Sequence, residues 1–430
     1  MLTISAATLG CKVNQYDTRA IVERFMDAGY IEVPFGSPSD VVLINTCTVT
    51  AEADRKSRQM IRRAVRQNPD ASVIVCGCLA QRSPESLLES GARLILGAWR
   101  RAEAVELLEQ AAASGGPMIA VEGDIGKAYE PLSIRAGTEG RVRATIKVQE
   151  GCDARCAYCI VPDVRGPARS RPLDDIAREA EKLQGYLELT LTGINLSAYG
   201  CDLPAVHGAP VTLADAVRTV SSASSVPRIR LGSLEPTLVT PEFIERLLNI
   251  NALCPHFPIA LQSGCDETLG RMRRPYTTAQ YVHAIAAVRD VYPGAAITTD
   301  ILVGFPGETD AEFRRTAEFV REISFSRVHV FPYSPRENTA AAAMPGQLPE
   351  AVKRGRAREL IKLGRELERE FISGMIGRSS SVLFEQDCLL GAEGYSGEYV
   401  RVRADGAVPG LLANVCLTDF SGEYARGVLS

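Results

Sequence analysis

Three cysteines lie close together in one short stretch of the chain, at the spacing C-x3-C-x2-C: Cys152, Cys156 and Cys159. Thiolates at such tight spacing bind zinc or an iron–sulfur cluster. A structural zinc ion usually takes four protein ligands, but the next cysteine along the chain is Cys201 and the nearest histidine is His207. A four-iron cubane held by three thiolates leaves one iron open to a further ligand. The stretch therefore favours such a cluster over a zinc site.

The overall composition is that of an ordinary globular protein of two or three domains, with 430 residues, 46% hydrophobic and 23% charged. The formal net charge is −4, so a nucleic-acid partner would have to be met by local basic patches. The sequence shows neither a signal peptide nor an apolar run long enough for a membrane span. We therefore expect a cytoplasmic protein with no membrane partner, in which the twelve cysteines serve metal binding or catalysis rather than disulfides.

Residues 1–115 alternate short apolar strands with amphipathic helices, which predicts a doubly wound parallel sheet. The expected strands are residues 3–9, 41–45, 72–75 and 94–96, and the expected helices are residues 14–30, 51–67 and 102–113. Residues 116–140 lie in a stretch rich in Gly and Pro and are expected to form a linker.

A second set of cysteines follows the first three of these strands: Cys11, Cys47 and Cys78. Ligands gather at the carboxyl ends of strands in open α/β sheets, so these three thiols could converge although they are far apart in sequence. Cys76 is two residues before Cys78. Alternation along an extended segment would place both on the same face, where Cys76 could compete as a ligand. The simpler interpretation is that Cys76 is a small core residue.

Residues 141–375 continue the alternation in longer units and predict an incomplete (β/α)6 barrel with a lateral gap, followed by a connecting helix. The expected strands are residues 143–148, 188–192, 228–231, 258–262, 296–303 and 327–333. Active sites of parallel barrels lie at the carboxyl ends of the strands, and the three-cysteine loop follows the first of them. Residues 376–430 change to short strands with Gly turns and predict a small β-barrel.

Seven motifs, taken together, resemble the radical S-adenosylmethionine (SAM) methylthiotransferases over essentially the whole chain. Within that family they most resemble the MtaB type, which acts on N6-threonylcarbamoyladenosine in tRNA. The motifs begin with TLGCKVNQYD at residues 8–17, and the others lie at residues 45–49, 77–81, 151–166, 261–269, 300–308 and 330–336. The resemblance implies a C-terminal TRAM domain, although residues 394–399 are acidic where contact with RNA is expected.

The resemblance also implies the cofactors and the reaction. Two [4Fe–4S] clusters are implied, an auxiliary one on Cys11, Cys47 and Cys78 and a SAM-binding one on Cys152, Cys156 and Cys159. The implied reaction replaces C2–H of N6-threonylcarbamoyladenosine, at position 37 of tRNA, by S–CH3. It needs SAM and an electron donor such as flavodoxin or ferredoxin, and it leaves the sulfur source open. The alternatives are a methylthiotransferase for N6-isopentenyladenosine or for a ribosomal-protein aspartate, and a non-catalytic RNA-binding protein with structural zinc.

Two further sets of residues are candidates for ligand contact. SAM contacts are expected from residues at or near the ends of barrel strands: Tyr158, Gly193, Glu235 and Gln262. Contacts with RNA phosphates are expected from arginines on one face of the helix after Cys47 and from arginines near the barrel mouth: Arg55, Arg58, Arg62, Arg66, Arg165, Arg271, Arg273 and Arg274.

Overall fold

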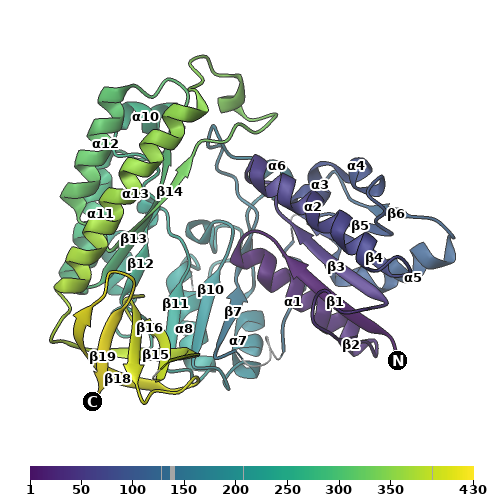
Figure 1. The fold of residues 1–430 in the computed structure, drawn as a ribbon, viewed down its shortest axis with the longest axis horizontal. Coiled ribbons are helices and arrows are strands. Elements are labelled where there is room, and N and C mark those ends of the chain that lie inside the picture. Colours follow the sequence, from purple (N-terminus) through teal and green to yellow (C-terminus); the bar gives the residue numbers. More distant parts are fainter. Residues whose placement is uncertain (127, 136–140, 207, 390) are drawn as a thin grey trace.

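The computed structural model describes residues 1–430 except 127, 136–140, 207 and 390. Six parallel strands form one sheet in the N-terminal part, in the order β2-β1-β3-β4-β5-β6 (Figure 1). Their bounds are β1 Thr3–Thr8, β2 Ile31–Glu32, β3 Val41–Thr46, β4 Ser72–Gly77, β5 Leu94–Leu96 and β6 Met118–Ala120. Every residue of β3 is buried, because this strand has a neighbour on each side and helices on both faces.

Helices cover both faces of this sheet, which confirms the predicted doubly wound fold. On one face, α1 (Lys12–Asp27) and α5 (Ala104–Ala113) pack Phe25 and Leu107 into a shared core. On the other face, α2 (Ala51–Gln67) packs Ile61 against Leu79 and Leu87. The latter two residues belong to α3 (Cys78–Arg82) and α4 (Pro84–Leu88).

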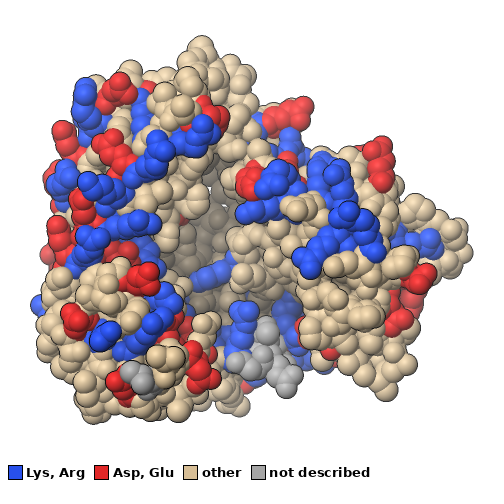
Figure 2. All heavy atoms as spheres, viewed as in Figure 1, with Lys and Arg blue, Asp and Glu red and all other residues tan. Residues whose placement is uncertain are grey.

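The central part is the predicted incomplete barrel of six parallel strands. They are β7 Arg143–Lys147, β10 Glu188–Thr192, β11 Arg228–Leu231, β12 His256–Pro258, β13 Ala296–Val303 and β14 Arg327–Pro332. Two three-stranded sheets, β11-β10-β7 and β12-β13-β14, are joined by isolated bridges such as Leu234 with Ile259. In the described part of the chain β7 and β14 do not pair. The molecule is hollowed between the barrel and the N-terminal part on the face seen in Figure 2.

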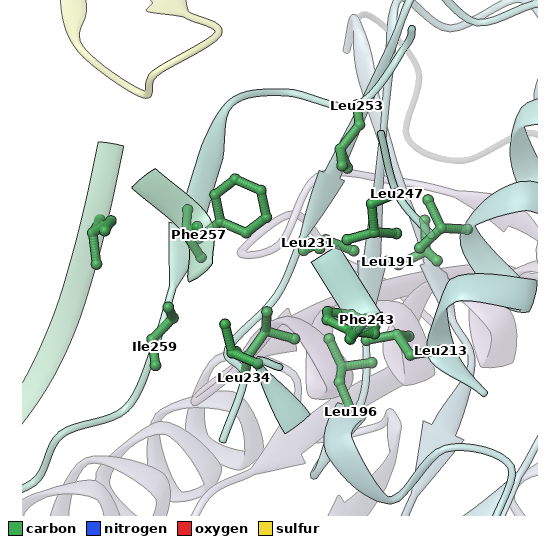
Figure 3. Close-up of a cluster of buried hydrophobic side chains, with 14 of the residues drawn as sticks. Leu191, Leu196, Leu213, Leu231, Leu234, Phe243, Leu247, Leu253, Phe257 and Ile259 are labelled. Atoms are coloured by element: carbon green, nitrogen blue, oxygen red, sulfur yellow. The ribbon is translucent and has the colours of Figure 1, made fainter. Parts of the chain in front are cut away.

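Helices on the outside of the barrel enclose its main hydrophobic core. They are α7 Leu173–Lys182, α8 Leu213–Ala223, α9 Pro241–Glu245, α10 Asp266–Arg271, α11 Thr278–Val291 and α12 Asp310–Ile323. Leucines of the strands, among them Leu191 and Leu231, pack with Leu213 and Phe243 of the helices (Figure 3). The expected fourth strand, 258–262, instead ends at Pro258. Gln262 has a left-handed backbone (φ 64°) and keeps only an isolated bridge to Ile301.

The short elements at the barrel mouth include α6 (Val161–Arg165) and the two-stranded sheet of β8 (Gln149–Glu150) and β9 (Arg169–Ser170). Four short 3-10 helices lie in connections of the described chain: η1 Arg101–Glu103, η2 Leu196–Ala198, η3 Pro236–Leu238 and η4 Ala340–Ala343. The long helix α13 (Glu350–Ser373) packs against β14 and α12. No helix among the described residues is both long enough and apolar enough to cross a membrane.

The C-terminal part is a closed five-stranded barrel, in the order β15-β16-β17-β19-β18. The strands are β15 Ser379–Cys388, β16 Gly391–Ser396, β17 Arg401–Asp405, β18 Leu412–Phe420 and β19 Ala425–Leu429. Strand β16 contains two glycines, Gly391 and Gly394. A Cβ at Gly394 would lie 1.9 Å from the carbonyl oxygen of Leu383, so close strand pairing here requires glycine despite its weak strand propensity.

The turn between β16 and β17 docks this small barrel onto the larger one. Arg228 and Arg230 of β11 donate hydrogen bonds to the carbonyl oxygens of residues 395–397, at 2.8–3.2 Å. The ring of Tyr399 stacks on that of His256, with centroids 5.0 Å apart. The acidic segment 394–399, which the resemblance placed toward RNA, therefore contacts the partial barrel.

Candidate functional site

The loop of Cys152, Cys156 and Cys159 is held in place on both sides. A Cβ at Gly151 (φ 69°) would lie 1.8 Å from the carbonyl oxygen of Pro167, so glycine is needed to open the loop. The backbone N–H of Cys152 donates to the carbonyl of Gly166 at 3.0 Å. On the other side Ala157 donates to the carbonyl of Met272 at 3.0 Å. These bonds fix the loop beyond the carboxyl end of β7.

Two of these sulfurs receive hydrogen bonds from side chains that the sequence analysis did not associate with them. Asn195 Nδ2 lies 3.6 Å from Cys152 Sγ, and Arg274 Nη1 lies 3.1 Å from Cys156 Sγ. Burial raises the pKa of Cys159 to about 12, so this thiol would ionise when a metal compensates the buried charge. Three thiols, two of them with side-chain donors for the anionic form, fit a cubane with one open iron.

The second set of cysteines also gathers at one place. Cys11 precedes α1, Cys47 follows β3 and Cys78 begins α3, after three neighbouring strands of the sheet. A Cβ at Gly10 would lie only 3.1 Å from Cys47 Sγ. Burial, followed by the nearby Cys78 thiol, raises the pKa of Cys47 to about 11. The side chain of Asn14 donates to the carbonyls of Leu9 and Thr46, at 2.8 and 3.0 Å, and so ties the first two loops together.

Neither set converges on a single ion: among the described residues, no group of three or more His, Cys, Asp or Glu side chains could hold one metal ion. This geometry is compatible with a cubane, in which each thiolate binds a different iron. The structure thus brings together both predicted cysteine sets, and their role as cluster ligands stays a prediction.

Cys76 does not compete for the second site. Alternation had placed it on the same face as Cys78, but Gly77 adopts φ 92° and turns the chain between them. Cys76 is fully buried in the core shared by α1 and α5, whereas Cys78 contacts Ile160 and Val164 of the loop and helix after Cys159. The interpretation of Cys76 as a core residue is confirmed. The prediction that Cys76 and Cys78 lie on the same face is wrong.

The N-terminal part lies against the carboxyl ends of the barrel strands, which brings the two cysteine sets toward one another (Figure 1). The backbone N–H of Ala51 donates to Ser334 Oγ, beyond the end of β14, at 3.1 Å. Arg336 donates to Thr48 Oγ1 at 2.8 Å and forms an ion pair with Asp54. The segments after Cys47 therefore contact the barrel mouth directly.

The predicted SAM contacts lie in different surroundings. Glu235 is ion-paired with Arg274, and burial raises its pKa. The ring of Tyr158 contacts that of Phe305 edge-on, with centroids 6.4 Å apart. A Cβ at Gly193 would lie 2.8 Å from Cβ of Gln149, so packing alone requires glycine there. Gln262 donates its backbone N–H to the carbonyl of Asp300 at 2.9 Å. Glu235, through Arg274, is thus linked to Cys156, and the roles of all four as SAM contacts stay predictions.

Two predicted RNA-binding arginines are unavailable to RNA. Arg165 is fully buried, and its guanidinium contacts Cys78, Asp17 and Glu150. The side chain of Arg274 is 4% exposed and is engaged by Glu235 and Cys156. Both predictions are wrong for the same reason: each arginine is used to partner buried anions and thiols inside the protein.

The other arginines near the mouth remain accessible. Arg271 is bonded to Glu312 at 2.9 Å but keeps a third of its side chain exposed. Arg273 is exposed and lines a cavity of about 690 Å³ together with Cys156 and Cys159. Residues 337–340, 342 and 343, which follow β14, also line this cavity.

A basic surface groove runs along α2. Arg55, Arg58, Arg62 and Arg66 line a depression of about 580 Å³ with Gln59, Val65 and Ser90. Figure 2 shows Lys and Arg gathered over this helix. Arg55 is paired with Glu52 at 2.6 Å, whereas Arg58 donates to Ser86 Oγ at 3.1 Å. The face is suited to contact with phosphates.

Comparison with known proteins agrees with this architecture. Residues 3–97 match the family described as "Uncharacterized protein family UPF0004", and residues 146–320 match the "Radical SAM superfamily". The fold is also similar to that of the radical SAM methyltransferase TsrM from Kitasatospora setae, with a TM-score of 0.57 and 15% identity, over 79% of this chain and 77% of that one. Partial barrel, cysteine loop and family match define a radical SAM enzyme, whose cofactors are SAM and [4Fe–4S].

Several curated relatives are similar over nearly the whole chain. The threonylcarbamoyladenosine tRNA methylthiotransferase MtaB of Bacillus subtilis is 39% identical over 94% of this chain and 90% of its own length. The protein of the same name in Thermotoga maritima is 34% identical over 100% and 97%. The tRNA-2-methylthio-N(6)-dimethylallyladenosine synthase of Moorella thermoacetica is 33% identical over 97% and 96%. The chain belongs to the radical SAM tRNA methylthiotransferases and is of the MtaB type.

Proposed function

We propose that this enzyme transfers a methylthio group to C2 of N6-threonylcarbamoyladenosine at position 37 of tRNA, with two [4Fe–4S] clusters, giving 2-methylthio-N6-threonylcarbamoyladenosine. Two three-thiol sites lie together at the mouth of one partial barrel, and this observation is the main support for the proposal. A reductant such as flavodoxin or ferredoxin would supply electrons, in the cytoplasm where tRNA is modified.

The protein's own residues contribute positioning. When bound, the clusters and SAM supply the radical chemistry that an unactivated C–H requires. Asn195 and Arg274 orient two of the thiolates through N–H donors, and Arg274 in turn orients Glu235. Glu235 is held in place by its backbone N–H, which donates to Ser197 Oγ at 2.8 Å. Small displacements of such groups are costly for a reaction that depends on geometry.

The choice of base follows from the chemistry of the modification. A threonylcarbamoyl group carries a carboxylate, so its pocket should offer a cation, whereas an isopentenyl pocket should be apolar. With Arg165 and Arg274 buried, Arg155 and Arg273 are the arginines that line the cavity beside Cys156 and Cys159, and Arg155 is paired with Asp163 at 3.3 Å. The three MtaB relatives support the same substrate.

A competition assay tests the substrate. Equal amounts of tRNA carrying N6-threonylcarbamoyladenosine and tRNA carrying N6-isopentenyladenosine are given to the reconstituted enzyme, and methylthiolated nucleosides are measured by mass spectrometry. We expect at least about tenfold more product from the first, the ratio for a binding difference of about 1.4 kcal/mol. Product from the isopentenyl tRNA alone would contradict the assignment and leave the family intact.

We further propose that the groove on α2 binds tRNA phosphates. The double variant Arg58→Glu/Arg62→Glu should weaken tRNA binding and lower the slope of log affinity against log salt by about 2, because two phosphate contacts are lost. Iron content should not change. The matched control is Arg354→Glu/Arg358→Glu, which reverses two exposed arginines at the same spacing on α13. Equal affinity of the α2 variant and the control would mean that the groove is an ordinary solvated face.

A further inference from the structure

Arg165 is the last residue of α6 and lies between the two cysteine sites. The helix begins two residues after Cys159. The next residue, Gly166, accepts the N–H of Cys152 at 3.0 Å and so closes the cluster loop. Val164, one residue earlier, packs on Cys78 of the second site. A movement of Arg165 would therefore displace both the loop of Cys152 and the loop of Cys78.

The guanidinium of Arg165 joins three segments of the chain. Its Nε lies 3.2 Å from Cys78 Sγ, at the start of α3. Its Nη2 donates to Asn14 Oδ1 and its Nη1 to Asp17 Oδ2 at 3.0 Å, both on α1. Nη1 also donates to Glu150 Oε1 at 3.0 Å, two residues before the SAM-cluster loop. Each of the three nitrogens is thus committed to a different partner or pair of partners.

Arg165 belongs to a buried network of opposite charges. Arg101 and Lys147 each contact both Asp17 and Glu150, and Arg101 also contacts Glu130. All of these side chains are at most 4% exposed. Arg101, Lys147 and Arg165 thus form ion pairs with these carboxylates in a dry interior, where the buried Arg169 also acts on Glu150. Removal of Arg165 takes away one positive charge directly beside the cysteine thiols.

We propose that Arg165 is a positioning residue that ties the auxiliary site to the SAM-cluster loop and raises the reduction potential of the cluster held by Cys11, Cys47 and Cys78. Reduction adds a negative charge to a cluster, and a buried cation with an N–H directed at a ligand sulfur stabilises that charge. The inference rests on the proposed function, because it requires a cluster at that site.

The test uses the full chain with Cys152, Cys156 and Cys159 replaced by Ala, so that only the second cluster titrates. Its reduction potential is measured by redox titration with EPR detection of the reduced cluster, and compared with those of the same protein carrying Arg165→Gln or Arg165→Lys. We expect a shift to more negative potential in both, smaller for lysine, which keeps the charge but cannot serve Cys78, Asp17 and Glu150 at once. Should the glutamine variant fail to fold, the lysine variant carries the comparison.

The matched control is Arg169→Lys. Arg169 is equally buried and lies four residues further on, but it donates to the carbonyls of Gly126 and Arg165 and contacts no sulfur among the described residues. The reduction potential of the second cluster in the Arg169→Lys variant should equal that in the parent protein. Unchanged potential and EPR signal in the Arg165 variants, at full iron content, would overturn the inference. A parent protein that binds no iron would instead overturn the two-cluster function, and the inference with it.

Discussion

Replacing Cys152, Cys156 and Cys159 together by alanine should abolish reductive cleavage of SAM and lower the iron content of the anaerobically reconstituted protein from about eight to about four per chain. The loop holding these thiols receives side-chain hydrogen bonds at two of its sulfurs and is closed by backbone bonds at both ends. Its fold should thus survive loss of the thiols. Iron analysis and chromatography of 5′-deoxyadenosine give the two readouts.

A matched control removes three other thiols. Cys201, Cys388 and Cys416 are all at least partly exposed and lie outside both sets. Their replacement by alanine should leave iron content and SAM cleavage as in the natural protein. Continued formation of 5′-deoxyadenosine by the Cys152/Cys156/Cys159 variant would show that the radical site has been assigned to the wrong cysteines.

Replacing Cys11, Cys47 and Cys78 by alanine should remove the other half of the iron and separate the two activities. SAM should still be cleaved, because the barrel loop keeps its own supports, but no methylthiolated nucleoside should form. Mass spectrometry of the tRNA, together with the 5′-deoxyadenosine assay on the same sample, measures both. Methylthiolation at the natural level in this variant would contradict a role for the N-terminal site.

The six-cysteine variant provides the accompanying control. It should bind essentially no iron, because the iron lost in each of the two three-cysteine variants comes from a separate site. If it retained as much iron as either three-cysteine variant, a further set of ligands would have to exist. Cys76, which is fully buried in the core of the N-terminal sheet, is not expected to contribute.

The parts of the candidate site that could be predicted follow from the spacing of cysteines along the chain and from the order of the strands. The loop cysteines are close in sequence, so their spacing alone indicates a cluster. Cys11, Cys47 and Cys78 could be grouped because consecutive parallel strands end at the same edge of a sheet, and the structure brings these thiols together there. The side chains that support the sulfurs could not be found in this way. Arg274 is 118 residues from Cys156, and nothing local distinguishes it from an arginine that binds RNA.

The sequence by itself determined the architecture: alternation of strands and helices specified the doubly wound sheet and the incomplete barrel, because burial of a strand face or helix stripe is a local periodic property. Tertiary structure alone decided where individual side chains act. Arg165 partners Cys78, 87 residues away, since packing of α6 on α3 brings its guanidinium against that thiol. The carbonyl oxygens of residues 395–397 accept hydrogen bonds from Arg228 and Arg230 for a similar reason. Burial removes water as a partner, so each buried charge must find its partner in whichever distant segment the fold brings against it.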